Sequence, residues 1–450
     1  MTAATAPQFG AGRFEVRGTL GAGGAGTVYR VYDHTLQREV ALKLLRTASG
    51  RDLYRFKREF RALADIVHPN LVALHELHAA EGTWFFTMEL VEGESFLDWV
   101  RASRREAGPQ RSRQDIRDAP VHELRLRAAL IQLVDALLAL HRAAKLHRDL
   151  KPSNVLVTPQ GRLALLDFGL VASVAEDNPE KLAVGTPVYM SPEQASDQTL
   201  TEASDWYSVG AMLYEALCGQ RPFEGEAEQV MTRKQTEVPL DPRHLATSPI
   251  PADLARLCMQ LLSPAPLARP SGLAILDQLG ATPSQKTRDM VRTANPASFV
   301  GRVQELEELR RALTDTRTRG VTMLVRGKSG IGKSTLIRKF LRGLGEQVFV
   351  LEGRCFEREQ VPFKMLDGIV DMLTGVIVAL PPEEVEALVP KELGSLVRLF
   401  PVMKRVKRFA DLTATAELPA DPAELRRRGF SALRSLLVKL ARLRPVVIFV

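Results

Sequence analysis

The spacing of apolar and polar residues changes along the chain in a way that predicts two kinds of structure, one after the other. From residue 13 to about residue 84, short apolar runs alternate with polar or glycine-rich turns, as in strands. Within this part, residues 53–66 carry bulky apolar side chains near helical spacing. From about residue 96 the pattern is mainly helical, and apolar residues at 126–138 recur every three or four positions. The pattern therefore predicts a small β-rich lobe followed by a larger α-rich lobe.

A second change follows residues 281–298, which are polar, contain proline and are interpreted as a linker between domains. After them, an amphipathic helix is expected at 303–313, an apolar strand at 321–325 and a helix at 336–341. The run at 446–450 is apolar throughout, as in a parallel strand buried on both faces. This alternation of strands and helices predicts an α/β domain after the linker.

Composition supports a globular, water-soluble chain of more than one domain. The 450 residues exceed one ordinary core, and 45% of them are hydrophobic and 25% charged. The net charge is +8, but lysine and arginine are spread along the whole chain without interleaved aromatic residues, so we expect no nucleic-acid partner.

Targeting and cysteine patterns point to the cytoplasm. No run approaches the about 20 apolar residues that a membrane-spanning helix needs, and the N-terminus lacks a signal-peptide pattern. Cys218, Cys258 and Cys355 lie far apart and show no metal-ligand spacing, so we expect reduced thiols. We therefore expect a cytoplasmic protein with no membrane segment.

One polar stretch interrupts the helical lobe. Residues 101–120 hold six arginines against three acidic residues, with a Gly-Pro pair among them. A solvated surface insertion and a docking site are both compatible with this composition, and the first is favoured.

A glycine-rich loop is the first candidate for binding phosphate. Residues 21–28 read GAGGAGTV, which fits G-x-G-x-x-G-x-V. The residues after it form a strand-like run, whereas a dinucleotide-binding motif would open a helix there. Because glycine has no Cβ, the backbone at Gly21, Gly23 and Gly26 can approach phosphates closely.

A lysine on the next predicted strand is placed to neutralise these phosphates. Lys43 ends the run Val40-Ala41-Leu42-Lys43, and Glu59, on the helix that follows, is the candidate to hold its ammonium group. The alternatives are a strand-end lysine that reaches water and a solvated helix carboxylate beside Arg58.

The most informative segment is residues 147–154, His-Arg-Asp-Leu-Lys-Pro-Ser-Asn. Asp149 would accept the proton of a hydroxyl that attacks a phosphate, and Lys151 would neutralise the charge on the transferred group. Asn154 offers a neutral oxygen to Mg²⁺, and Asp167, 18 residues after Asp149 in an Asp-Phe-Gly triplet, offers a charged one. Phosphoryl transfer needs mostly positioning and charge neutralisation, and this set supplies both.

Together these segments resemble the signature motifs of eukaryotic-type serine/threonine protein kinases, of the kind found in bacteria. The resemblance covers residues 13–280 and implies the bilobal α+β kinase fold, with an N-lobe at 13–87, a hinge at 88–91 and a C-lobe at 92–280. It also implies that the nucleotide contacts a further set of residues, namely Leu20, Val28, Ala41, Glu89 and Val91.

Other kinase-like elements follow in the expected order. Residues 185–193, Gly-Thr-Pro-Val-Tyr-Met-Ser-Pro-Glu, resemble the substrate-binding and A-P-E elements, with Ser191 in place of alanine. Asp205 resembles the residue that braces the catalytic loop, and Arg269 resembles the arginine that pairs with the A-P-E glutamate, here Glu193. Lys151 and Thr186 resemble serine/threonine rather than tyrosine kinases.

The resemblance implies transfer of the γ-phosphate of Mg·ATP to serine and threonine hydroxyls of proteins, in intracellular signal transduction. Autophosphorylation, the protein substrate and the oligomeric state are left open. A pseudokinase is disfavoured because Lys43, Asp149 and the other motif residues are all present. A nucleotide-gated switch without phosphotransfer is a competing interpretation, but such a switch would not need the base Asp149.

The activation segment departs from the kinase pattern. Arg148 precedes the catalytic aspartate, which in the family often accompanies activation by phosphorylation, yet Ser173 is the only hydroxyl residue between 169 and 185. The same stretch carries Glu176, Asp177 and Glu180. Either one of these carboxylates pairs with Arg148 in place of a phosphate, or all three are solvated loop charges.

A second phosphate-binding motif lies after the linker. Residues 327–335 fit G-x-x-x-x-G-K-[ST] between a predicted strand and a predicted helix, which is the context of a P-loop. Backbone N–H groups at the helix N-terminus would cradle phosphates, Lys333 would reach the β- and γ-phosphates and Ser334 would bind a second Mg²⁺. The nucleotide-binding residues predicted here are Gly327, Gly332, Lys333, Ser334 and Thr335.

The flanks of this motif resemble AAA-type and STAND ATPases, so residues 299–450 are expected to be the N-terminal part of such a domain. The residues that carry this resemblance are the Phe-Val-Gly-Arg run at 299–302 and the Gly-Arg-Cys-Phe-Glu run at 353–357. A Walker B acid is expected after Val450. We therefore expect an incomplete α/β P-loop domain that belongs to a longer protein and does not hydrolyse ATP competently by itself.

Overall fold

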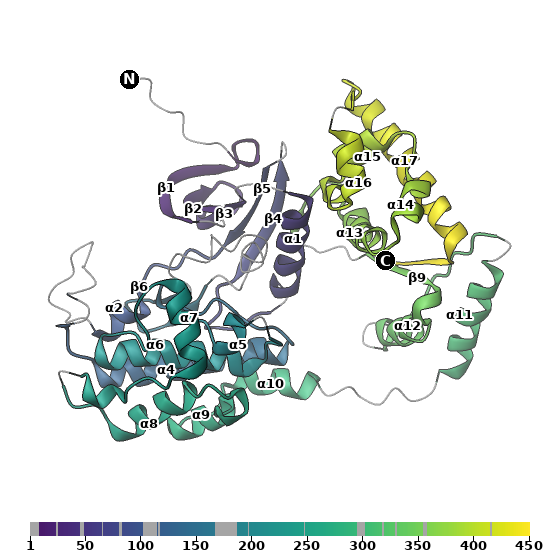
Figure 1. Cartoon of the computed structure of the whole chain (residues 1–450). Coiled ribbons are helices and arrows are strands. Elements are labelled where there is room, and N and C mark those ends of the chain that lie inside the picture. The colour runs from purple at the N-terminus through teal and green to yellow at the C-terminus, as the bar shows by residue number, and fades with distance from the viewer. Residues whose placement is uncertain are drawn as a thin grey trace, which may run out of the picture. The chain divides into compact units, whose positions relative to one another are not determined.

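A computed structural model of the chain describes residues 9–23, 26–45, 49–64, 66–80, 83–101, 115, 118–166, 187–196, 198–246, 248–294, 302–316, 319–328, 331–353, 358–414 and 416–450. These residues fall into two compact units (Figure 1). The first comprises Met1–Arg46, Arg55–Glu76 and Phe85–Asn295, and the second comprises Thr47–Tyr54, Leu77–Trp84 and Pro296–Val450.

The N-terminal part of the chain forms an antiparallel sheet, as the alternating pattern predicts. Strands β1 (Phe14–Gly23), β2 (Gly26–Asp33), β3 (Arg38–Leu45) and β5 (Thr83–Met88) pair in that order. One face of the sheet buries a cluster of Phe9, Phe14, Val31, Val40, Leu42 and Phe85. The other segments of this part are α1 (Gly50–Ala64), which covers most of the helix predicted at 53–66, and β4 (Leu74–Ala80).

The larger lobe of the first unit is mainly helical (Figure 1). Its longest helix, α4 (Glu123–Arg142), is apolar on one face near its start and buried on nearly every side from Leu133 to His141, because other helices surround it. The other helices are α2 (Phe96–Arg101), α5 (Pro192–Ala195), α6 (Glu202–Cys218), α7 (Ala227–Thr236), α8 (Ala252–Leu261), α9 (Gly272–Gln278) and α10 (Gln285–Ala294).

A small sheet in this lobe carries the catalytic-loop segment. Its strands are β6 (Glu94–Ser95), β7 (Val155–Val157) and β8 (Leu163–Leu165), which pair in that order. Helix α10 lies within the stretch interpreted as a linker, and the Arg142 guanidinium donates to the Thr287 carbonyl at 2.6 Å. Of the arginine-rich 101–120 stretch, Arg101 is buried and donates to the carbonyl of Ala216, while most of the remainder lies outside the described residues.

The second unit combines two parallel strands with helices. Strands β9 (Phe349–Glu352) and β11 (Val446–Phe449) pair in parallel, as in an α/β fold. The remaining elements are α11 (Val303–Asp315), α12 (Lys333–Arg342), β10 (Glu359–Gln360), α13 (Lys364–Val378), α14 (Pro382–Leu388), α15 (Leu393–Leu399), α16 (Lys407–Thr413) and α17 (Pro422–Leu443). The helices predicted at 303–313 and 336–341 are thus confirmed.

Two expectations about this unit are wrong. Residues 321–325 are described but form no strand, and the side chains of Met323 and Leu324 are exposed. The reason is that a strand requires a hydrogen-bonded neighbour, and within the described residues β9 and β11 pair only with each other in their sheet. Strand β11 itself is only half-buried, because it has one neighbour rather than the covered faces of a central strand.

Two further observations bear on the environment of the protein. Cys218 and Cys258 are free thiols, and both are buried. Among the helices that the structure describes, none combines the length and the apolar character needed to cross a bilayer.

The contact between α6 and α8 leaves no room for a side chain at Gly210. A Cβ there would lie 2.7 Å from Cβ of Leu261. Overpacking a core in this way costs about 1–3 kcal/mol, so Gly210→Ala should lower the free energy of unfolding of the first unit, measured by denaturant titration.

The matched control is Gly375→Ala on α13, where a Cβ would meet nothing within 4 Å. Replacing a helical glycine in open space by alanine raises the free energy of unfolding by about 0.4–1 kcal/mol, so this variant should be as stable as the parent or more stable. Equal losses of unfolding free energy in the two variants would contradict the close contact between α6 and α8.

Candidate functional site

The side chains of the 147–154 segment converge on one carboxylate. Nζ of Lys151 donates to Oδ2 of Asp149 at 2.7 Å, and Nδ2 of Asn154 donates to the Asp149 carbonyl at 2.8 Å and to Oδ2 at 3.2 Å. The other oxygen, Oδ1, is buried and has no hydrogen-bond partner among the described residues. Asp149 is therefore held by one oxygen, and the other is left to accept a further proton donor.

The backbone before Asp149 is held in a conformation that few residues adopt. Arg148 has φ of 66°, in the left-handed region that a residue with a Cβ rarely enters. The Asp205 carboxylate, on α6, accepts from the backbone N–H of His147 and of Arg148, both at 2.9 Å. These bonds confirm that Asp205 braces the catalytic loop, and they stabilise its strained backbone.

Asp205 is almost completely buried, so its charge needs partners. Burial alone would raise the pKa of its carboxyl, but a 2.8 Å hydrogen bond with Nε2 of His141 and the nearby His147 hold that pKa below its ordinary value. Asp205 therefore stays ionised at neutral pH and accepts at both oxygens. His141, on α4, is a supporting residue that the sequence motifs did not point to.

The glycine-rich segment forms the β1–β2 hairpin, as expected from its flanks. Gly21 and Gly23 lie on β1, and Gly26 begins β2 opposite Gly23. Gly26 has φ of 151°, and a Cβ there would lie 2.0 Å from the Leu44 carbonyl oxygen, so the sheet itself requires this glycine. A Cβ at Gly21 would meet nothing within 4 Å, so the backbone there is open to a ligand.

The nucleotide-contact residues predicted on β2 and β3 lie on hydrogen-bonded neighbouring strands. Val28 pairs with Lys43, and Ala41 pairs with Met88 at the end of β5. Lys43 is buried at the centre of the sheet rather than at a strand end in water. Glu59 lies on α1, and its side chain is outside the described part, so the expected Lys43–Glu59 pair stays a prediction. Leu20, on β1, is half-exposed.

The segment after β5 is tied to the catalytic-loop sheet by an ion pair. The Glu89 carboxylate accepts from Nη1 and Nη2 of Arg162 at 2.5 and 3.1 Å, and Nε of Arg162 donates to the Pro69 carbonyl at 2.8 Å. Burial would raise the pKa of Glu89, but the bond with Arg162 lowers it. The side chain of Glu89 is thus occupied by Arg162, and its backbone N–H donates to the Ala73 carbonyl at 2.9 Å, which leaves the backbone carbonyl of Glu89 for a ligand. Val91 follows it outside any strand.

Several predicted residues lie outside the described part. They are the metal-binding candidate Asp167, the activation-segment residues Ser173, Glu176, Asp177 and Glu180, Thr186, and Cys355 in the second unit. The two interpretations of the activation-segment carboxylates therefore stay open.

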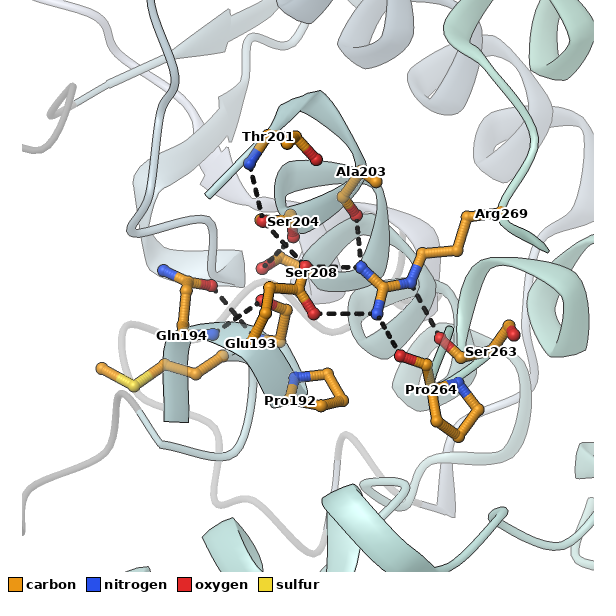
Figure 2. Close-up of polar contacts among 12 residues, drawn as sticks. Pro192, Glu193, Gln194, Thr201, Ala203, Ser204, Ser208, Ser263, Pro264 and Arg269 are labelled. Carbon is orange, nitrogen blue, oxygen red and sulfur yellow. Dashed lines mark hydrogen bonds and ion pairs between the residues drawn. The ribbon is translucent and has the colours of Figure 1, made fainter. Parts of the chain in front are cut away.

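A buried ion pair anchors the start of α5. Nη1 and Nη2 of Arg269 donate to Oε1 and Oε2 of Glu193 at 2.7 and 2.9 Å, which confirms the predicted pair (Figure 2). The other Arg269 donors reach the carbonyls of Ser263, Ala203 and Pro264 at 2.8, 2.8 and 3.0 Å. All five guanidinium N–H groups are therefore satisfied.

The Glu193 carboxyl stays charged despite its burial. Burial would raise its pKa, but the hydrogen bonds from Arg269 and from Oγ of Ser204 hold it below its ordinary value. Because each charge of the pair has a complete set of partners, the pair is compatible with a water-excluded site.

The serine that replaces the expected alanine has a structural role. Ser191 caps α5: its Oγ accepts from the Gln194 N–H, and its own N–H donates to Oε1 of Gln194, which forms a capping box. Nε2 of Gln194 then donates to the carbonyl of Arg148 at 2.8 Å. The cap thus joins α5 to the catalytic loop.

The P-loop motif opens α12 as predicted. Gly332 is the N-cap residue with φ of 88°, a conformation that favours glycine. Nζ of Lys333 donates to the carbonyls of Gly327 and Lys328 at 2.7 and 2.9 Å, so its ammonium lies within the loop. Ser334 and Thr335 follow in the first turn of α12 and are exposed. A chain of backbone N–H groups at a helix N-terminus is suited to bind phosphate.

Sequence reasoning missed three polar residues near the site. They are His141 and Arg162, described above, and Lys234 on α7, a buried lysine that contacts the backbone of residues 187–190. The available signal for Lys234 was its place one helical turn after the apolar Val230. The other two are recognisable only once the helices and strands are assembled.

Removing one member of the buried Arg269–Glu193 ion pair should lower the free energy of unfolding of the first unit. Arg269→Met leaves the Glu193 carboxylate buried without its main partner, which typically costs about 3–5 kcal/mol. Denaturant titration should show this loss in the transition of the first unit. The double variant Arg269→Met/Glu193→Gln removes both charges and should recover part of the loss. A double variant less stable than the single one would contradict this account.

Comparisons with known proteins agree with this geometry. Residues 14–279 match the family model described as protein kinase domain, and residues 298–450 match the one described as AAA ATPase domain.

Curated proteins similar to this chain are serine/threonine-protein kinases. The DNA damage-responsive kinase RqkA of Deinococcus radiodurans is 36% identical over 278 residues, which cover 60% of this chain and 39% of RqkA. PrkC of Bacillus subtilis is 31% identical over 51% of this chain and 34% of PrkC, and PknA of Mycobacterium tuberculosis is 32% identical over 54% of each. The matched part of this chain thus spans between about a third and about a half of the length of these relatives.

Proposed function

Because this chain belongs to the protein kinase family, we propose that it transfers the γ-phosphate of ATP to serine or threonine hydroxyls of proteins. The observation that carries the proposal is the Asp149 carboxylate. One of its oxygens is fixed by Lys151 and Asn154, and the other is buried and free of partners among the described residues. A carboxylate held this way can accept the proton of an attacking hydroxyl.

The proposed roles of the other residues follow from charge and position. Lys151, in contact with Asp149, would stabilise negative charge on the transferred group. Lys43, buried on β3 and paired in register with Val28, would hold the α- and β-phosphates, with Glu59 of α1 as its proposed partner. Backbone groups of the β1–β2 hairpin and of residues 88–91 would hold the phosphates and the adenine.

A magnesium ion fits this arrangement as the second part of the proposal. Asn154 is buried beside Asp149, and its amide oxygen, together with the carboxylate of Asp167, is the kind of ligand that Mg²⁺ prefers. When bound, the ion would neutralise charge on the β- and γ-phosphates. The proposed domain boundaries are 13–280 for the kinase and 299–450 for the P-loop module.

The second unit supports an additional, regulatory role. The P-loop geometry around Lys333 favours nucleotide binding there, with Ser334 as the proposed Mg²⁺ ligand. We infer that this module senses nucleotide and acts on signalling by the kinase in the cytoplasm. Proteins with serine or threonine acceptors, including the chain itself, are the proposed partners.

Transfer of labelled phosphate from ATP to casein tests the main proposal. Asp149→Asn keeps the size of the side chain but cannot take the hydroxyl proton, so the rate should fall by about 10²–10⁴. Ser153→Ala, an exposed neighbour in the same loop, is the matched control and should keep most of the activity. Equal rates in the parent and in Asp149→Asn would refute the assignment of the base.

Nucleotide binding by the second unit is tested independently of catalysis. In an Asp149→Asn background, Lys333→Ala should weaken binding of a fluorescent ATP analogue at one of two sites by about tenfold or more, since a charge-assisted contact to phosphate is lost. Lys328→Ala removes a neighbouring charge whose side chain is at a variable position of the motif, and should change binding little. A single site that is unaffected by Lys333→Ala would contradict the P-loop proposal.

A further inference from the structure

Lys234 is a buried cation that the proposed phosphoryl transfer does not use. Only 1% of its surface is exposed, although α7 presents its other charged residues to water. Its Nζ donates to the backbone carbonyls of Pro187 and Met190, at 2.5 Å each, and lies 5.6 Å from the ring centre of Tyr207. Burying an ammonium group costs free energy that such acceptors only partly offset. Its presence in the core therefore needs a reason other than stability.

The segment that Lys234 contacts is joined to the catalytic loop through α5. Residues 187–190 form turns rather than a helix or strand, so their carbonyls depend on side chains for hydrogen bonds. Besides the two bonds from Lys234, Oγ of Ser208 donates to the Tyr189 carbonyl at 2.8 Å. The segment leads directly into the α5 cap, where Gln194 donates to the carbonyl of Arg148, the residue before the proposed base.

We propose that Lys234 is a positioning residue for the polypeptide substrate: it fixes residues 187–190, which resemble the substrate-binding element of protein kinases and lead into the α5 cap that contacts the catalytic loop. Val188 and Met190 are partly exposed there and would meet the substrate, while Pro187 and Tyr189 are buried. This inference rests on the proposed kinase activity. It predicts an effect on the binding of the acceptor protein and none on the binding of ATP.

The charge state of Lys234 gives the inference a pH signature. Among the described residues, no carboxylate lies within ion-pair distance of Nζ, and burial lowers the pKa of Lys234 to about 7. The titratable and charged groups on the elements packed around it are Tyr189 of the segment, Glu193 of α5, Tyr207 and Glu215 of α6, and Arg269 beyond the Tyr207 ring.

The sign of the pH effect follows from this lowered pKa. Below pH about 7, Lys234 is an ammonium ion with strong, charge-assisted hydrogen bonds, and as pH rises through that value it becomes an amine that donates more weakly. The hold on residues 187–190 should therefore weaken as pH rises. The free energy of unfolding should instead rise with pH between about 7 and 10.5. In this range the unfolded chain keeps the proton of Lys234 and the folded chain does not, so unfolding takes up a proton that becomes scarcer as pH rises.

The test compares Lys234→Met with the parent chain in phosphate transfer to casein. Removing the ammonium should raise the KM for casein by about tenfold, the order expected for a lost charge-assisted hydrogen bond, and leave the KM for ATP unchanged. In the parent, the KM for casein should rise between pH 6 and 8 as Lys234, with its pKa of about 7, loses its proton. In Lys234→Met it should be independent of pH over this range.

Two further variants separate the charge from the fold. Arg233→Met removes one positive charge from the exposed face of the same helix and should leave both KM values unchanged. Lys234→Gln keeps an N–H donor without a charge, so it should give an intermediate KM for casein that does not depend on pH. This variant tests the inference if Lys234→Met does not fold.

The outcomes distinguish this inference from the kinase proposal. Equal changes in the KM for casein and for ATP, or an unchanged pH dependence in both Lys234 variants, would overturn the role of Lys234 while leaving the kinase proposal intact. A parent chain with no transfer activity, matched by Asp149→Asn, would overturn both.

Discussion

The buried carboxylate of Asp205 is the constraint on which the active-site region depends. It accepts hydrogen bonds from two successive backbone N–H groups, those of His147 and Arg148, and from His141. Without these bonds, Arg148 would not keep a left-handed backbone, which costs of order 1–3 kcal/mol. Because the next residue is Asp149, the position of the proposed base is set by Asp205 of α6, 56 residues further along the chain.

The same physical solution recurs around the site. Irregular segments cannot satisfy all of their own carbonyl and N–H groups, so buried charged side chains from elsewhere in the fold do it. Arg269 supplies donors to three carbonyls while it pairs with Glu193, and Lys234 supplies donors to two. Each of these charges is expensive to bury, and each holds a segment next to the catalytic loop. Asp205 of α6, Lys234 of α7 and Arg269 thereby support the loops around the proposed catalytic residues.

Local sequence was informative wherever chemistry or conformation requires a particular residue. Asp149, Lys151 and Asn154 were assigned from their spacing and are in direct contact, and the pairing of Arg269 with Glu193 was expected from kinase-like motifs alone. Reasoning from apolar runs was less secure in the second unit. Residues 321–325 have the composition of a strand but lack a hydrogen-bonded neighbour among the described residues, and a strand exists only as part of a sheet.

The sequence by itself determined which groups are candidates for the chemistry: the proposed base, the lysines and the glycines of the two predicted phosphate-binding loops. It also predicted the two-lobed pattern of strands and helices. These follow from spacing along the chain, because residues within one loop or one turn are neighbours whatever the rest of the fold does. Only the tertiary structure decided which distant side chains hold those groups. The support of Asp205 by His141 and the contact of Lys234 with residues 187–190 depend on elements that meet across the core, and no local pattern encodes such a meeting.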